Sequence, residues 1–187
     1  QLWGHSPEGF TALDNVSFKI ERGEAVGLTG ESGCGKTTLG RALLGLLDRV
    51  SGEILLEGCN LLAGKKGSGT RRKALQMVFQ DPYSSLNPKI RIGKAIEEVV
   101  KVHGPHLDQE AARARVYELL HQVGLTEEYY NRYPHACSGG QRQRAVIARA
   151  LAAEPSFLVC DESVAALDVS VQAQVTNLLN DLRARLG

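Results

Sequence analysis

Eight consecutive residues have the composition and spacing of a loop that binds phosphate. Residues 30–37 read Gly-Glu-Ser-Gly-Cys-Gly-Lys-Thr, which matches GxxxxGK[ST] between a short apolar run and a helical pattern. The three glycines allow positive φ and let backbone N–H groups point at phosphate oxygens, while the following helix adds its positive dipole end. Lys36 is predicted to reach the β- and γ-phosphates of a nucleotide, and the Thr37 hydroxyl to ligate Mg²⁺.

A second stretch supplies the acidic groups that a nucleotide site needs. Residues 157–162 read Phe-Leu-Val-Cys-Asp-Glu, a short apolar run that ends in two carboxylates. Asp161, at the end of a buried strand, is predicted to hold Mg²⁺ directly or through water. Glu162, one residue further on, is placed to polarise an attacking water.

A third stretch, Ser138-Gly-Gly-Gln141, opens a helical pattern. Ser138 is a good N-cap residue, and the two glycines free the backbone to approach a ligand closely. A single nucleotide needs only one phosphate cradle. Two interpretations therefore remain open at this point: a capped helix, or a second anion-binding helix start that serves another molecule's phosphate.

The hydrophobic pattern predicts the elements that must position these residues. Strands are expected at 12–20, 25–29, 52–56, 75–79 and 157–160. Helices are expected at 36–47, 92–103, 108–123, 138–153 and 170–186. Strands at both ends with a helical block between them favour an α/β core interrupted by a helical insert, placed at about residues 81–150.

Composition limits the classes of function. The 187 residues suit one domain, and a net charge of +1 gives no global field to attract nucleic acid or anionic lipid. No apolar run approaches the roughly 20 residues that cross a bilayer, so a membrane role would act through a partner. The four cysteines form no CxxC pair, which disfavours a zinc ribbon or a redox dithiol. Three of them lie in or beside the motifs above, where a free thiol fits better than a disulfide, and this favours a reducing, cytoplasmic setting.

Together these motifs resemble the ATPase subunit of an ABC transporter. Walker A spans residues 30–38, the signature 137–141, Walker B 157–161 and the D-loop 165–168, with Gln80 as the loop glutamine. The resemblance implies a P-loop NTPase core with a mixed sheet, an N-terminal antiparallel β subdomain and an inserted α-helical subdomain. It divides a single ABC ATPase domain, 1–187, into a RecA-like core with the β subdomain at 1–80 and 151–187, and a helical signature subdomain at 81–150.

The resemblance also implies a mechanism, in which two ATPase protomers sandwich two ATP molecules. The signature of each protomer caps the γ-phosphate bound to Walker A of the other. The implied catalytic residues are Glu162 and Gln80, and the implied Mg²⁺ ligands are Thr37, Gln80 and Asp161. The implied nucleotide-binding residues are Trp3, which competes with Phe10 for adenine stacking, and Gly30, Glu31, Ser32, Gly33, Cys34, Gly35, Lys36, Thr37, Thr38, Ser138, Gly139, Gly140 and Gln141.

Two further segments, 79–88 and 167–174, resemble the dipeptide, oligopeptide and nickel importers. This resemblance implies ATP hydrolysis that drives import through integral membrane permease subunits, with an extracytoplasmic solute-binding protein as an indirect partner. The subunit would lie at the cytoplasmic, inner face of the cell membrane. The transported solute, and whether the dimer pairs like with like, cannot be read from the sequence.

The alternative is an ABC-type ATPase that acts on DNA or ribosomes. The stretch between Lys36 and Asp161 leaves room only for a compact helical insert, without the coiled coils or zinc modules of such relatives. A basic cluster at residues 65–73 contains no interleaved aromatic residues and is interpreted as a solvated loop. No nucleic-acid partner is therefore expected.

The sequence departs from the family pattern in three places. Cys137 stands where the signature usually begins with Leu or Phe, and a small thiol is expected to pack there. Ser163 stands where the family usually has Pro. The family's switch histidine would fall beyond the helix at 170–186. Because the chain begins at Gln1 without Met and ends within a helical pattern, both ends are expected to be cut. Without the switch histidine, weak ATPase activity is expected for the chain as it stands.

Overall fold

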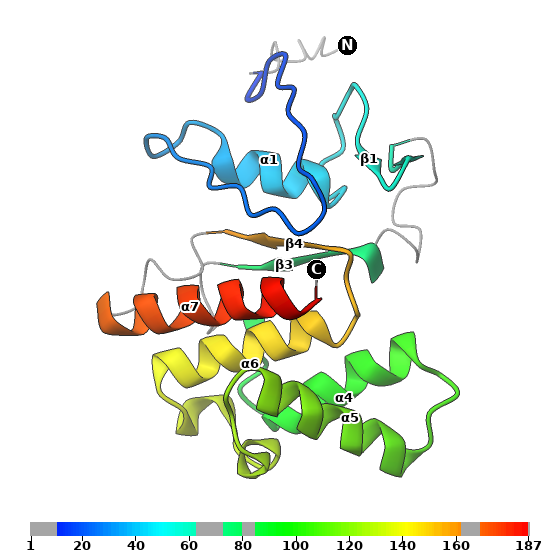
Figure 1. Cartoon of the computed structure of the whole chain (residues 1–187), viewed down its shortest axis with the longest axis vertical. Helices are drawn as coiled ribbons and strands as arrows, with labels where there is room; N and C mark the ends of the chain where they lie inside the picture. Colours follow the sequence, from blue (N-terminus) through cyan, green and yellow to red (C-terminus); the bar gives the residue numbers. More distant parts are fainter. Residues whose placement is uncertain (1–10, 63–72, 80–84, 162–168, 187) are drawn as a thin grey trace, which may run out of the picture.

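The described residues build three layers, as the computed structural model in Figure 1 shows. The middle layer is a parallel pair of strands, β3 (Leu75–Val78) and β4 (Phe157–Cys160). Helix α1 (Lys36–Leu43) covers one face, and α6 (Gly139–Leu151) and α7 (Val169–Leu186) lie on the other. The structure describes residues 11–62, 73–79, 85–161 and 169–186.

The parallel pair extends by one hydrogen bond beyond its last strand residues. Leu75 pairs with Phe157 and Val78 with Cys160, and the Asp161 amide then donates to the Val78 carbonyl at 3.0 Å. Backbone pairing thus fixes Asp161 at the carboxyl end of the strands. Open α/β sheets bind ligands at this edge.

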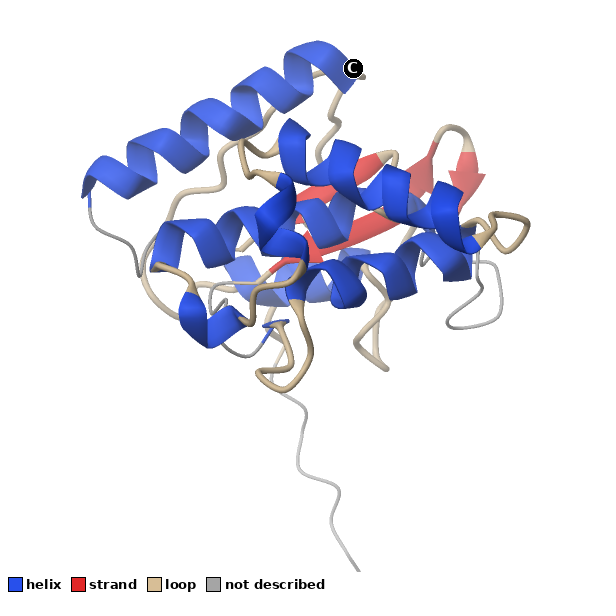
Figure 2. Ribbon diagram, turned by 90° about the horizontal axis from the view of Figure 1, so that it is seen from below, coloured by secondary structure: helices blue, strands red, loops and turns tan. Residues whose placement is uncertain are grey.

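A helical layer forms the far side of the molecule, where α4 (Ile92–His103) and α5 (Gln109–Gln122) pack with α6. Seen from below, these helices cover the strands (Figure 2). Two short 3₁₀ turns, η1 (Glu127–Tyr130) and η2 (Pro134–Ala136), connect α5 to α6. The largest fully buried apolar side chains lie mostly in this layer, including Ile92, Ile96, Val116, Leu119, Leu120 and Ile147.

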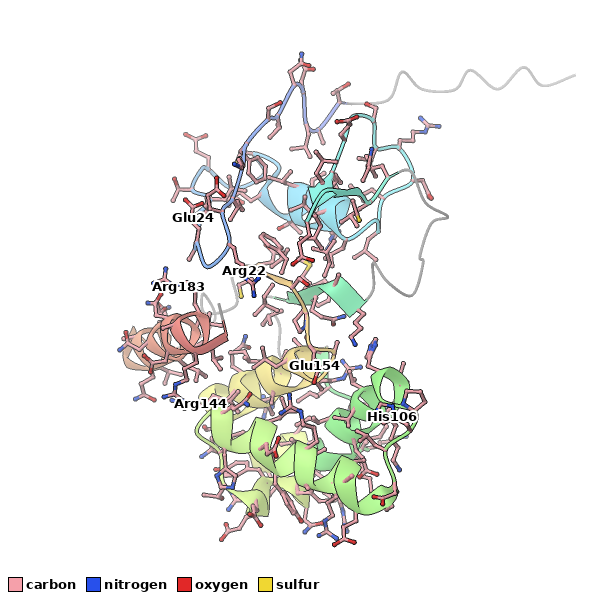
Figure 3. All side chains as sticks on the ribbon, turned by 45° about the vertical axis from the view of Figure 1, so that its right-hand side comes forward. Arg22, Glu24, His106, Arg144, Glu154 and Arg183 are labelled. Atoms are coloured by element: carbon pink, nitrogen blue, oxygen red, sulfur yellow. The ribbon has the colours of Figure 1, made fainter. Side chains whose placement is uncertain are left out.

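Side chains labelled in Figure 3 tie α5 to α6. Arg144 Nη1 donates to the Val123 carbonyl at 2.9 Å, directly after α5. Arg115 on α5 lies 3.4 Å from Glu154, in the turn between α6 and β4. These contacts join the end of α5 to the first half of α6, and the middle of α5 to the turn that follows α6.

The predicted helices are confirmed, most of them to within two residues. The exception is α1, which ends at Leu43 rather than at residue 47. The Gly45 amide donates to the Ala42 carbonyl and the Leu46 amide to the Arg41 carbonyl, both at 3.0 Å. These bonds form a Schellman cap, which requires the positive φ that Gly45 adopts, +70°. The cap ends the helix.

The predicted strands at 12–20 and 25–29 are wrong for the structure described. These residues pair with no described strand, and Phe18 and Leu28 are 54% and 55% exposed. An alternating apolar pattern shows which side chains share a face, but a strand also needs a backbone partner. The predicted mixed sheet is accordingly described as two separate pairs, one parallel and one antiparallel.

The antiparallel pair is a small hairpin of β1 (Leu55–Leu56) and β2 (Cys59–Asn60), shorter than the strand predicted at 52–56. Its two-residue turn, Glu57-Gly58, has φ of +50° and +80°. Positive φ at both positions is typical of the turns that match the twist of paired strands.

Among the described helices, none has the length and apolar character needed to cross a membrane.

One buried carboxylate organises the helical layer. Glu97 on α4 is 3% exposed and is surrounded by donors from three elements. Lys94 and Lys101 lie 3.0 and 2.9 Å from its oxygens, Gln109 Nε2 donates at 2.7 Å, and the Tyr130 hydroxyl donates as well. Burial by itself raises the pKa of Glu97, but these hydrogen bonds outweigh it and lower the pKa from 4.5 to about 2.

The lowered pKa of Glu97 predicts an acid-dependent loss of stability. The ionised carboxylate stabilises the folded chain fully above its unfolded pKa near 4.5, and the contribution disappears as the pH falls toward 2. A shift of this size corresponds to about 3 kcal/mol. Glu97→Gln should therefore remove up to that much of the pH dependence of the free energy of unfolding, measured with urea at a series of pH values.

The matched control is Glu98→Gln, which changes the exposed neighbour on the same helix. This variant should keep the pH dependence of the wild type. If Glu97→Gln loses stability with falling pH as steeply as the wild type, the Glu97 cluster does not stabilise an ionised carboxylate.

Candidate nucleotide-binding site

The phosphate-binding loop enters α1 through two glycines with positive φ. Gly33 has φ of +82° and Gly35, the N-cap of α1, has φ of +101°. Gly30 does not adopt positive φ. A Cβ at Gly30 would lie 2.7 Å from the sulfur of Cys34, so close approach within the loop explains this glycine instead.

Lys36 folds back over the same loop. Its Nζ donates to the carbonyls of Gly30 and Glu31, both at 2.8 Å, and lies 3.8 Å from the Cys34 sulfur. No described side chain caps the first N–H groups of α1. An ammonium and uncapped helix N–H groups at one loop form a positive site that suits phosphate.

The structure brings Thr37 and Asp161 together from distant parts of the chain. Thr37 Oγ1 donates to Asp161 Oδ1 at 2.9 Å. Gly40 packs α1 closely on the two strands, because a Cβ there would lie 3.3 Å from Val159 and 3.4 Å from Met77. Gly40 was not among the residues predicted from the sequence. The signal was a glycine on the apolar face of the helix, one turn after Lys36.

The oxygens of Thr37 and Asp161 suit Mg²⁺ chemically. Hydroxyl and carboxylate oxygens are hard ligands, and Mg²⁺ in nucleotide sites takes one or two protein oxygens together with phosphate oxygens. Among the described residues, no group of three or more His, Cys, Asp or Glu side chains could hold a metal ion. Thr37 and Asp161 therefore suit an Mg²⁺ ion that phosphate oxygens of a ligand also coordinate, rather than an ion enclosed by protein side chains alone.

The signature stretch is a complete capping box at the start of α6. Ser138 Oγ accepts from the Gln141 amide at 3.3 Å, and Gln141 Oε1 accepts from the Ser138 amide at 3.0 Å. The structure thus confirms the helix cap, one of the two interpretations left open by the sequence. A role toward a second phosphate stays a prediction.

Cys137 packs as expected for a small apolar residue. It is 7% exposed, belongs to the core, and its thiol donates to the Tyr133 carbonyl at 3.6 Å. Burial raises the pKa of the Cys137 thiol. The thiol is therefore a packing group, unlike the exposed Cys34 in the phosphate-binding loop.

The remaining predicted residues divide into two groups. Glu31 and Ser32 lie exposed in the loop, and Thr38 is half-buried on α1. Others fall outside the described residues: Trp3, Phe10, Gln80, Glu162, Ser163 and the segment 165–168. A hollow of about 620 Å³ between α5 and the end of α7 is lined by none of the predicted site residues.

Comparison with known proteins agrees with this arrangement. Residues 13–165 match the model of the family described as ABC transporter. The oligopeptide transport ATP-binding protein OppF of Haemophilus influenzae is 49% identical over 188 residues, which cover 100% of this chain and 56% of that protein. The chain therefore spans little more than half the length of such relatives.

Solved structures with the same fold come from the same kind of protein. CbiO1 of Clostridium perfringens, part of the ABC transporter complex cbiONQ, superposes with a TM-score of 0.85 at 30% identity, covering 98% of this chain and 71% of that chain. The ATP-binding cassette MJ0796, solved as a dimer bound to ADP and Pi, gives 0.79 at 31% identity, with coverage of 93% and 75%.

Proposed function

The chain belongs to the ABC transporter family, and we propose that it is the ATP-binding and ATP-hydrolysing part of an importer, driving solute uptake through separate membrane permease subunits. The observation that carries the proposal is the 2.9 Å contact between Thr37 and Asp161. It joins the phosphate-binding loop to the acidic end of β4, as a nucleotide site requires.

Each residue of the site has a proposed role toward ATP. Lys36 and the loop N–H groups hold the β- and γ-phosphates, while Thr37 and Asp161 hold Mg²⁺, which neutralises charge on the phosphate oxygens. Glu162 polarises the attacking water. Gln80 links the Mg²⁺ site to the permease, and Trp3 stacks on the adenine.

The proposed working unit is a dimer, supported by the dimeric form of the related MJ0796 cassette. In it, the capped start of α6 contacts the γ-phosphate bound by the other protomer. We propose that the ATPase domain divides into a RecA-like core with the β subdomain, at 1–80 and 151–187, and a helical signature subdomain at 81–150. The transporter would place this subunit at the cytoplasmic face of the membrane.

Peptides are the proposed class of solute. The oligopeptide transport protein OppF, 49% identical to this chain, supports this choice over nickel. Solute selection would belong to the permease and an extracytoplasmic binding protein, since the described site offers groups for a nucleotide and not for a peptide.

The proposal is tested by isolating the full protein from its native cells under mild detergent. We expect it to co-purify with integral membrane subunits and to hydrolyse ATP. Recovery with nucleic acid and without membrane subunits would favour the ATPases that act on DNA or ribosomes.

Cys34 gives a chemical test of the loop. Its thiol is exposed and lies 3.8 Å from Lys36 Nζ, so an alkyl group there would occupy the space proposed for phosphate. Alkylation by N-ethylmaleimide should abolish ATP binding. Mg-ATP at 100 times its Kd should slow the labelling of Cys34 about tenfold or more, by mass action.

The exposed Cys59 on β2 is an internal control, because it lies in the hairpin outside the proposed site. Its labelling rate, followed by peptide mass spectrometry in the same sample, should not respond to Mg-ATP. Equal labelling of Cys34 with and without Mg-ATP would remove the loop from the nucleotide site.

A further inference from the structure

Helix α7 is held against the core by one apolar stripe. Val175 and Leu182 are 0% and 5% exposed, and Val171, Leu178 and Leu179 pack against the same core. These positions recur at the spacing of one helical face. The helix lies beside α6, as Figure 1 shows. Because the other residues of the stripe are buried against the core, they fix the position of Val171 at its start.

Val171 occupies the space next to the start of α6. A Cβ added at Gly140 would lie 2.6 Å from Val171 Cγ1, and its three nearest heavy atoms would all belong to Val171. Valine is branched at Cβ and has few alternative rotamers, so the methyl group cannot easily move away. Any side chain at position 140 would therefore push α7 and the first turn of α6 apart.

The backbone of Gly140 gives no other reason for glycine. The residue lies in the first turn of α6, without the positive φ that would exclude other side chains. Alanine favours a helix more than glycine does. From the sequence, Gly140 was predicted to allow close approach of a ligand. In the described structure, the group that approaches Gly140 is Val171.

We propose that Val171 is a positioning residue for the signature, and that α7 sets the direction of the Ser138–Gln141 cap through Gly140. The inference rests on the proposed function for its effect on ATP hydrolysis. Helix α7 is the next described element after β4 and Asp161. The segment that bears the proposed Mg²⁺ ligand is therefore followed by the helix that supports Ser138–Gln141, the proposed contact to the second phosphate.

A size exchange tests the proposal in the full protein. Gly140→Ala should lower kcat for ATP about tenfold or more, because small displacements of positioned groups cost large factors in rate. The KM for ATP should change little, since the phosphate-binding loop is untouched. Val171→Ala alone should lower kcat about threefold through looser support. The double variant should recover most of the loss of Gly140→Ala, because the new methyl group fills the space left at residue 171.

Val175→Ala is the matched control, since it removes the same atoms from the same buried stripe but does not face Gly140. Added to Gly140→Ala, it should not restore kcat. If the glycine is needed for close approach of a ligand, Val171→Ala will not restore kcat either, and the proposal is overturned.

Thermal unfolding of the same variants separates this proposal from the proposed function. Gly140→Ala should lower the unfolding midpoint, and Val171→Ala but not Val175→Ala should raise it again. A wild-type protein without ATP turnover would contradict the proposed function, and the unfolding midpoints would then decide the Gly140–Val171 contact. Equal midpoints for Gly140→Ala and wild type would overturn the contact itself.

Discussion

Lys36→Ala is expected to abolish ATP binding, with a loss of affinity of at least about 100-fold by calorimetry. The Lys36 ammonium lies in the phosphate-binding loop, 2.8 Å from two backbone carbonyls. Its proposed partners in the complex are oxygens of the β- and γ-phosphates. Charge-assisted hydrogen bonds contribute about 1.5–3 kcal/mol each. Since 1.4 kcal/mol is about a tenfold change in affinity, loss of two such bonds accounts for the expected effect.

The folded chain should tolerate this change. Lys36 is the first residue of α1, alanine favours a helix, and water can replace the ammonium at the exposed carbonyls. Arg41→Ala, which removes an exposed cation from the last turn of the same helix, is the control and should bind ATP normally. Unchanged affinity in a folded Lys36→Ala protein would contradict the assignment of the loop.

The helices could be predicted because their signals are local. The bounds of α4 agree with its apolar pattern at residues 92–103. The start of α5 is marked by Asp108, whose carboxylate accepts from the Ala111 amide at 2.8 Å, and its end by Gly124 with φ of +70°. Caps and periodicity both act within a few residues, so the sequence contains them directly.

The strands were less predictable because their partners are distant in sequence. The strands at 75–79 and 157–160 were predicted separately, and the structure pairs residues 75–78 with 157–160 in parallel. Residues 12–20 and 25–29 were also predicted as strands but pair with no described strand. An apolar pattern, whether alternating or continuous, cannot distinguish these cases, since the distinction depends on which backbone groups meet in the folded chain.

In the candidate site, too, some features could be predicted from the sequence and others could not. Motif spacing predicted Lys36, Thr37 and Asp161 as members of one site, and the contact between Thr37 and Asp161 agrees with it. The packing that supports the site was not predicted. Gly40 against Val159, and Gly140 against Val171, are close approaches between elements that are far apart in sequence. A glycine marks such an approach, but only the fold shows what approaches it.

Glu162→Gln is expected to lower ATP turnover about 10²- to 10⁴-fold, the usual cost of losing a general base. Glutamine has nearly the same shape but cannot accept the proton of the attacking water. ATP binding should persist, because Lys36, Thr37 and Asp161 are unchanged. The full protein carrying this substitution should therefore accumulate in saturating Mg-ATP as a closed dimer, detected by size-exclusion chromatography with light scattering.

Ser138→Arg in the Glu162→Gln protein should prevent the dimer, because it places bulk and charge where the other protomer's phosphate is proposed to lie. This change also removes the N-cap of α6, so the control must remove a comparable cap elsewhere. Asp108→Arg does so at the start of α5, outside the proposed interface, and should leave the dimer intact. A Glu162→Gln protein that stays monomeric at saturating Mg-ATP would reduce Ser138–Gln141 to a helix cap, because no second protomer would then reach it.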